Sequence, residues 1–225
     1  MPSVIATTSR CSEHGHPEIR VVFDQEFVLD SDVSELLTRI EESVAGGASY
    51  ADGDTLHIGW VAARLVVTDD GTLSIHEPDM VFYPVLWVES VNHALIQQRL
   101  QLAVCASVLG SDDARFPSHH DTALLCERLG ETEGFVMRRS EPEDDSSGWF
   151  VGCDQEGHEH DDPSLLLRAS LYEIVTRYEP RIVPYLALPF GACVETRRGS
   201  PAISMNDQPL EFRPGSVLES NFPQG

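Results

Sequence analysis

The residues whose types and spacing could support metal chemistry lie between positions 158 and 162. His158, His160 and Asp162 stand at alternating positions. Alternating residues of an extended segment share one face, so these three side chains could converge on a divalent cation. A cation held in this way could activate a water molecule, which makes a metal-dependent hydrolase one function that the sequence allows. A solvated acidic loop is the simpler interpretation of the same residues.

Two other groups of histidines offer less. Cys11, His14 and His16 lie in an N-terminal segment with few apolar residues and with no obvious fourth ligand. His119 and His120 stand in a polar stretch, where a turn and the start of a helix are expected. We predict no metal site at either group.

The cysteines do not form a recognisable framework. There are five of them, at long spacings and without a Cys-x-x-Cys pair, which argues against paired disulfides and against a thiolate zinc site. Cys153 could act as a nucleophile with His158 or His160 as its base. A chain with five cysteines and nine histidines offers many such pairs, however. We therefore expect reduced thiols, no bound metal and no cofactor.

Other catalytic motifs are missing from the sequence. There is no phosphate-binding loop, no Gly-x-Gly-x-x-Gly, no Gly-x-Ser-x-Gly and no His-Glu-x-x-His. The sequence therefore makes no positive case for an enzyme.

The first half of the chain reads as an α+β unit. A loose tail is expected at 1–17. A helix follows the first strand, because Val33, Leu36, Leu37, Ile40 and Val44 fall on one face at helical spacing. Asp32 and Glu35 could form a capping box at its start. Strands are predicted at 18–29, 55–61, 64–67 and 73–75, with a hairpin turn at 69–71 in which Gly71 supplies the positive φ. Further helices are predicted at 88–109 and 122–129.

The second half begins with a change of composition at Gly130. Residues 131–162 hold eleven acidic residues against two arginines, and we place the domain boundary at this change. Strands are predicted at 134–138, 148–153 and 190–196, with a strand or helix at 165–178. The expected architecture is α+β, with two small domains at 18–129 and 130–212, each a mostly antiparallel sheet packed with helices. A second tail is expected at 213–225.

The charge of the whole chain restricts its partners. Asp and Glu number 37 against 15 basic residues, all of them Arg, which gives a formal net charge of −22. So acidic a surface repels phosphate backbones and anionic lipids, and it suits either a basic protein partner or simple solubility. The sequence shows neither an apolar run long enough for a membrane span nor a signal peptide, so we expect a cytoplasmic protein.

Motifs of the second half resemble a known family. Gly134 to Arg139, Glu141-Pro142 and Ser147-Gly148-Trp149 are followed, after a helix, by Glu179-Pro180 and by Leu188-Pro189-Phe190-Gly191. This order is similar to the immunity-protein-thirty-three family, which occurs beside bacterial polymorphic toxins and type VI secretion effectors. The family's Gly-Asp-Glu element is spaced differently here, as Gly152-Cys153-Asp154-Gln155-Glu156. The resemblance covers about residues 133–205.

The resemblance implies a protein without catalysis of its own that binds and neutralises a cognate toxin. A basic nuclease with the restriction-endonuclease fold, delivered by a type VI secretion system, is the expected toxin, because its phosphate-binding cleft would attract carboxylates. An adaptor that helps to load an effector is an alternative. Trp149 could be an interface anchor or a core residue of its strand. The residues expected to contact the partner are Glu141, Glu143, Asp144, Asp145, Trp149, Asp154, Glu156, Glu159, Asp161 and Asp162.

Overall fold

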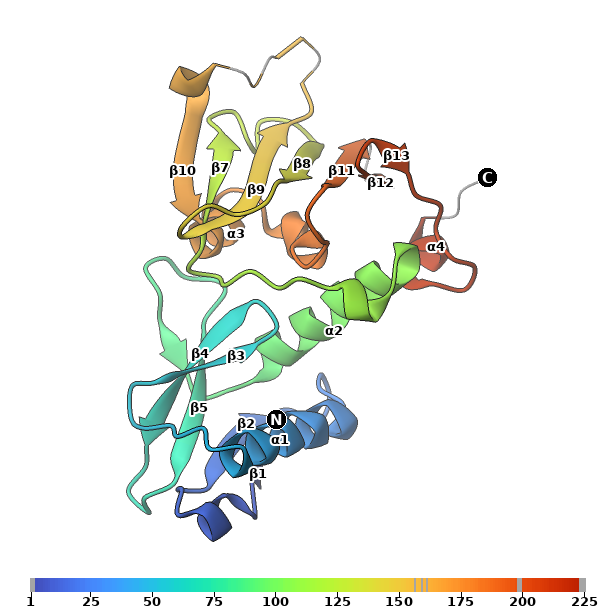
Figure 1. Ribbon diagram of the computed structural model, residues 1–225. Coiled ribbons are helices and arrows are strands. Elements are labelled where there is room, and N and C mark those ends of the chain that lie inside the picture. The colour runs from blue at the N-terminus through green and yellow to red at the C-terminus, as the bar shows by residue number, and fades with distance from the viewer. Residues whose placement is uncertain (1–2, 156, 159, 161, 198–199, 223–225) are drawn as a thin grey trace. The chain divides into compact units, whose positions relative to one another are not determined.

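A computed structural model describes residues 3–155, 157–158, 160, 162–197 and 200–222. The chain divides into two compact units, 1–98 and 99–225. Each unit combines a mainly antiparallel sheet with helices, which confirms the predicted α+β class (Figure 1). Within the described residues, no helix is long and apolar enough to cross a membrane.

The N-terminal unit is built on a mixed sheet in which, among the described residues, six strands take part. Five of them follow the order β1-β2-β5-β4-β3, and β6 pairs with β5. Only the β2–β5 pair is parallel in this described sheet. The strands are β1 (Val4–Thr7), β2 (Ile19–Phe23), β3 (Thr55–Ile58), β4 (Val61–Val67), β5 (Leu73–Pro78) and β6 (Trp87–Val88).

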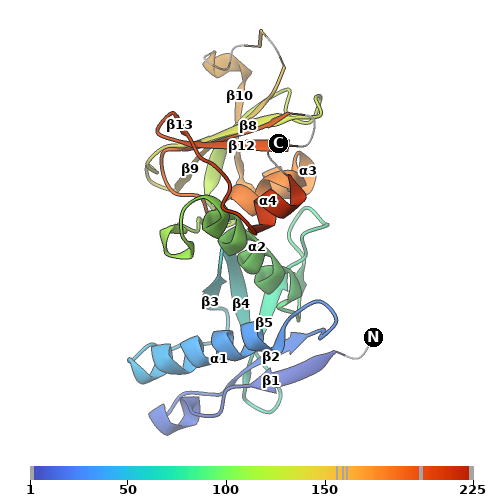
Figure 2. The ribbon, with the colours of Figure 1, turned by 90° about the vertical axis from the view of Figure 1, so that its right-hand side faces the viewer.

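Helix α1 (Asp30–Ala45) follows β2 and lies beside β1 and β2 in Figure 2. Its buried residues are Val33, Leu36, Ile40 and Val44, which are four of the five predicted for this face, whereas Leu37 is half-buried. The predicted capping box is wrong, because the helix begins two residues before Asp32 and its N-cap, Leu29, offers no side-chain acceptor. The acidic residues of the first turn, Asp30 and Asp32, still interact favourably with this end of the helix dipole.

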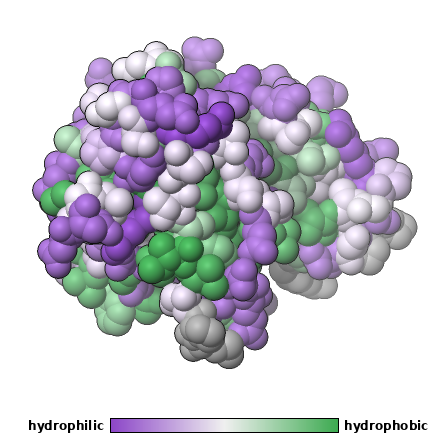
Figure 3. Space-filling view, turned by 90° about the horizontal axis from the view of Figure 1, so that it is seen from below, coloured by the Kyte–Doolittle hydropathy of each residue, from purple (hydrophilic) through white to green (hydrophobic). Residues whose placement is uncertain are grey.

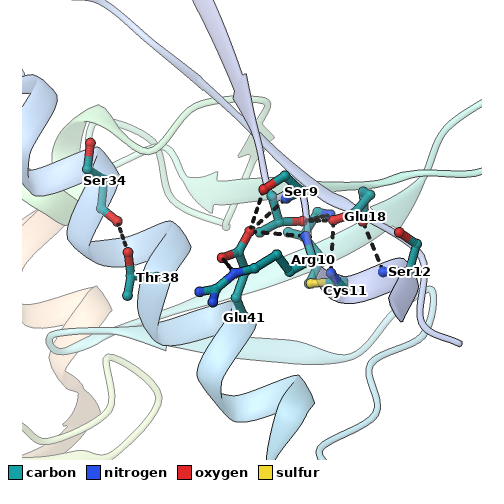
Figure 4. A network of polar contacts seen from close by, with 10 residues as sticks. Ser9, Arg10, Cys11, Ser12, Glu18, Ser34, Thr38 and Glu41 are labelled. Carbon is teal, nitrogen blue, oxygen red and sulfur yellow. Dashed lines mark hydrogen bonds and ion pairs between the residues drawn. The ribbon is translucent and has the colours of Figure 1, made fainter. Parts of the chain in front are cut away.

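The N-terminal segment is not the loose tail that its polar composition suggested. Residues 4–7 form β1, and Cys11–His14 form the short 3₁₀ helix η1 with the Cys11 side chain fully buried. Two carboxylates hold the segment in place by accepting hydrogen bonds from it (Figure 4). Glu41 accepts hydrogen bonds from the Ser9 and Arg10 amides at 2.7 and 3.2 Å, and Glu18 accepts the Ser12 amide at 2.9 Å. Polar residues therefore order this segment through hydrogen bonds.

The C-terminal unit contains, among the described residues, a seven-stranded sheet of order β10-β7-β9-β8-β11-β12-β13. Only its β7–β9 pair is parallel in the described part. Figure 2 shows α3 and α4 on one side of the sheet. The strands are β7 (Thr122–Cys126), β8 (Phe135–Arg139), β9 (Ser146–Cys153), β10 (Leu166–Ser170), β11 (Ala192–Arg197), β12 (Ser200–Met205) and β13 (Gln208–Pro209). The helices are η2 (Ser111–Asp113), η3 (Pro163–Leu165), α3 (Leu171–Arg177), η4 (Pro180–Tyr185) and α4 (Val217–Asn221).

The division between the units differs from the predicted boundary at Gly130. It falls between Gln98 and Arg99, inside helix α2 (Asn92–Val108). Residues 122–129 were predicted to form a helix, but 122–126 form strand β7, which pairs with β9 and β10 and so belongs to the C-terminal sheet. A short apolar run such as Thr-Ala-Leu-Leu-Cys suits a helix or a strand equally, and tertiary pairing decides between them. The change of composition at 130 marks acidic loops inside one unit.

The C-terminal segment 213–225 also differs from the predicted tail. It contains α4, whose Leu218 is buried. The Arg213 amide donates to the Ser107 carbonyl of α2 at 2.8 Å, and the Leu218 amide to the Ser107 hydroxyl at 3.4 Å. Residues 213–222 are therefore part of the packed C-terminal unit.

The surface mixes charge with apolar groups. Figure 3 shows a face that is hydrophilic over most of its area, with hydrophobic residues in separate patches. In the N-terminal unit, Val81, Phe82, Tyr83 and Leu86 are each more than half exposed.

Candidate functional site

The structure brings four potential metal ligands together at one end of the C-terminal sheet. Sγ of Cys126 lies 3.9 Å from Sγ of Cys153 and 3.2 Å from Nε2 of His158. Sγ of Cys153 lies 3.7 Å from Nε2 of His160. All four ligand atoms lie within 4.8 Å of one another. We call these four residues the Cys₂His₂ cluster.

This cluster corrects the metal set considered from the sequence. His158 and His160 do converge, but Asp162 is not part of the group. The Asp162 carboxylate instead caps η3, accepting the Ser164 amide at 2.9 Å and the Ser164 hydroxyl at 2.7 Å. The two cysteines, which sequence spacing had set aside as ligands, take its place. They were missed because they are 27 residues apart and meet only through strand pairing.

The cluster is poorly suited to nucleophilic chemistry. Cys126 and Cys153 are each 1% exposed. Burial raises the pKa of the Cys153 thiol above its usual value, which disfavours the reactive thiolate. The geometry therefore offers no accessible Cys–His pair here.

The other histidine groups have structural partners. His16 is buried, and its Nε2 accepts the Tyr50 amide at 2.9 Å. His119 is also buried and packs against the rings of His120 and Tyr172, with centroids 3.9 and 5.8 Å away.

The described acidic residues that were expected to contact a partner fall into two groups. Residues 141–145 form the exposed loop before β9, whereas Asp154 and Asp162 are exposed beyond the other end of that strand. At roughly 3.3 Å per residue, an eight-residue strand such as β9 keeps its two ends about 23 Å apart. The single acidic surface expected from the sequence is thus two separate acidic regions.

Four further residues were expected to contact the partner. Glu156, Glu159 and Asp161 fall outside the described residues. Trp149 is only 2% exposed, so it is a core residue and not a surface anchor. Its Nε1 donates to the Leu186 carbonyl at 3.0 Å.

Arg139 joins the motifs that carried the family resemblance. Its guanidinium is buried and donates to the carbonyls of Leu186 and Leu188 at 3.1 and 2.6 Å, and to that of Ser147 at 3.3 Å. It also lies 5.4 Å from the Trp149 ring centroid. Burial lowers the pKa of Arg139 to about 10, so the group stays charged at neutral pH. The Arg139 guanidinium therefore links the Ser-Gly-Trp motif to the Leu-Pro-Phe-Gly motif. This role of Arg139 was not predicted from the sequence.

One face of the C-terminal sheet is open to solvent. Strand register places Arg168, Leu124, Phe150 and Arg138 in one row across β10, β7, β9 and β8. Leu124 is 43% exposed, Arg138 and Arg168 are exposed, and Phe150 is half-buried. We call this row the open sheet face.

The open sheet face adjoins the acidic loop 141–145. A hollow of about 490 Å³ is lined by Leu124, Phe150, Arg168, Glu141 and Glu143, among others. A second hollow, of about 550 Å³, lies at the other end of β9 and includes Asp154 and His160 in its lining. An apolar centre with charged groups around it has the composition of a protein-binding surface.

Comparison with known proteins supports the family resemblance. Residues 100–201, a little under half of the chain, match the family model of the Imm33-like domain. No curated protein and no solved structure matches the chain. The matched region contains the whole Cys₂His₂ cluster, Arg139 and the open sheet face.

Proposed function

We propose that this protein is an immunity protein, which binds and neutralises a cognate bacterial toxin without catalysis of its own. The observation that carries the proposal is the match of residues 100–201 to the Imm33-like domain. The acidity of the chain supports it, because a nuclease must hold phosphates in a basic cleft that carboxylates can occupy. We further propose that the toxin is a nuclease effector of a type VI secretion system and that the two proteins meet in the cytoplasm.

The open sheet face and the loop 141–145 are the proposed contact surface. Leu124 is 43% exposed and Phe150 is half-buried, so both offer some apolar area to a partner, and Glu141 and Glu143 line the same hollow. A basic toxin surface would gain both apolar burial and charge complementarity there.

The test is co-expression with the product of a toxin gene adjacent to the gene of this protein. We expect cells that express both proteins to survive, cells that express the toxin alone to die, and the two proteins to purify as one complex. Cell death despite soluble expression of this protein, with no complex, would contradict the proposal. A stable complex without protection would point to the adaptor function.

A further inference from the structure

The ends of two neighbouring parallel strands hold the Cys₂His₂ cluster. Cys126 is the last residue of β7 and Cys153 the last residue of β9, and register pairs Leu125 with Val151 just before them. His158 and His160 follow β9 within seven residues of Cys153. We propose that Cys126, Cys153, His158 and His160 bind one zinc ion that stabilises the C-terminal unit.

The distances are close to those of tetrahedral coordination. Zinc bonds of 2.0–2.3 Å at a tetrahedral angle place ligand atoms roughly 3.3–3.8 Å apart. The two sulfurs are 3.9 Å apart, Cys126 Sγ is 3.2 Å from His158 Nε2 and Cys153 Sγ is 3.7 Å from His160 Nε2, while no pair of the four atoms is more than 4.8 Å apart. A small shift of side chains would therefore complete the site around an ion.

The local backbone is arranged for these side chains. A Cβ on Gly152 would lie 2.9 Å from Cε1 and from Nε2 of His160, so the glycine leaves the room that this imidazole occupies. The His158 amide donates to the Gln155 carbonyl at 3.2 Å, which holds His158 near the residues that follow β9. The His158 and His160 rings, with centroids 5.0 Å apart, lie edge to face.

Backbone donors point at both sulfurs. The Arg128 amide donates to Sγ of Cys126 at 3.3 Å, and the Gln155 amide donates to Sγ of Cys153. Each donor therefore lies two residues after its cysteine. Such outer hydrogen bonds favour a coordinated thiolate and orient it, as is general for protein metal sites.

The composition of the cluster selects the metal and its role. Two thiolates and two imidazoles in a tetrahedral arrangement favour zinc over hard cations such as Mg²⁺ or Ca²⁺. Four protein ligands fill the coordination sphere of a structural zinc ion, whereas a catalytic zinc ion keeps one position for water. The proposal therefore gives the ion no hydrolytic role, and it stands whether or not the protein binds a toxin.

The experiment measures metal in the full-length protein, purified without a histidine tag under reducing conditions. Elemental analysis of the wild type is expected to give one zinc ion per chain. After removal of zinc, Co²⁺ should produce the intense visible absorption of a tetrahedral site together with a sulfur-to-cobalt charge-transfer band. Cys126→Ser is expected to weaken Co²⁺ binding at least 10-fold.

Two controls and one rescue variant separate coordination from folding. Cys193→Ser and His14→Gln change residues outside the cluster and should keep one zinc ion per chain. His158→Cys keeps a ligand in place and should retain the metal with a stronger charge-transfer band. These responses are expected of coordination and not of packing alone.

Several results would overturn the proposal. One is that the wild-type protein contains no metal and gives no tetrahedral cobalt spectrum. Another is that Cys126→Ser retains as much zinc as the wild type. A third is that the purified protein contains iron in place of zinc. A Cys126–Cys153 disulfide that persists in protein purified under reducing conditions would overturn it as well.

Discussion

At the scale of single residues, Arg139 links three segments of the C-terminal unit. Four carbonyls from three segments converge on its buried guanidinium, those of Arg115, Ser147, Leu186 and Leu188. The Phe190 ring centroid lies 4.9 Å from its Cζ. No carboxylate among the described residues forms an ion pair with it, so peptide dipoles hold the charge.

We predict that Arg139→Met destabilises the protein by about 3 kcal/mol or more, because buried carbonyls lose their donors. Arg138→Met is the matched control, since Arg138 directly precedes Arg139 in β8 and its side chain is exposed. That variant should remain within about 0.5 kcal/mol of the wild type. Urea denaturation followed by circular dichroism measures the free energy of unfolding of both variants. Equal losses would contradict the prediction that the hydrogen bonds from Arg139 to the buried carbonyls stabilise the unit.

Leu124 provides a second test at this scale. Leu124→Arg should leave the stability nearly unchanged but weaken the toxin complex by about 2 kcal/mol, roughly 30-fold, because the residue lies at the centre of the proposed contact surface. Leu167→Arg is the control, since Leu167 is 44% exposed on neighbouring β10 but pairs with buried Leu125 on the other side of the sheet. Calorimetric titration of the isolated proteins gives both affinities, and equal losses would move the contact surface elsewhere.

The individual residues also show what sequence spacing cannot reveal. The four metal-binding candidates are separated by up to 34 positions, from Cys126 to His160, and only the parallel pairing of β7 with β9 makes them neighbours. His158 and His160 were recognised because they are close in sequence. Arg139 and Trp149 were not identified as partners of Leu186, because those contacts depend on how the end of η4 packs against the sheet.

At the scale of elements, the N-terminal segment depends on the ionised Glu18 carboxylate. Burial raises the pKa of Glu18, but hydrogen bonds from Thr8, Ser12 and Cys11 outweigh this effect and lower the pKa to about 2. Because the carboxylate is more acidic in the folded state, its contribution to stability is complete above a pH of about 4.5 and is lost as the pH falls toward 2.

We therefore predict that Glu18→Gln lowers stability at pH 7, and that the difference from the wild type shrinks as the pH falls from about 4.5 toward 2. Glu35→Gln, in an exposed position of α1, should show no such trend. Urea midpoints measured across this pH range test the prediction. A constant difference between the wild type and Glu18→Gln would mean that the hydrogen bonds do not depend on ionisation.

The elements that sequence predicted well are those with a clear period or turn signal. The buried face of α1 and the hairpin around Gly71, whose φ is +82°, follow directly from local residue types. The ambiguous stretch 165–178 contains both predicted alternatives, β10 and then α3, with the Ser170 hydroxyl accepting the Glu173 amide at the start of the helix. Segments 1–17 and 122–126 were misassigned because long-range pairing, not local preference, orders them.

At the scale of the whole molecule, the net charge of −22 produces a negative electrostatic field around the protein. The carboxylates of the loop 141–145 add a local concentration of negative charge beside the open sheet face. A basic toxin would be attracted by the whole surface and oriented by that loop. The two contributions can be separated, because reversing the same number of charges at different places changes the net charge equally.

We predict that the triple reversal of Glu143, Asp144 and Asp145 to Arg slows association with the toxin and weakens protection in the survival assay. The triple reversal of Glu13, Glu26 and Glu35, all exposed in the N-terminal unit, is the control, and each triple variant moves the formal net charge from −22 to −16. Stopped-flow association rates at increasing salt should show a steep decline for the wild type and the control, and a shallow one for the loop variant. Equal rates for the two variants would assign the steering to the overall charge, and wild-type rates independent of salt would remove electrostatic steering from the mechanism.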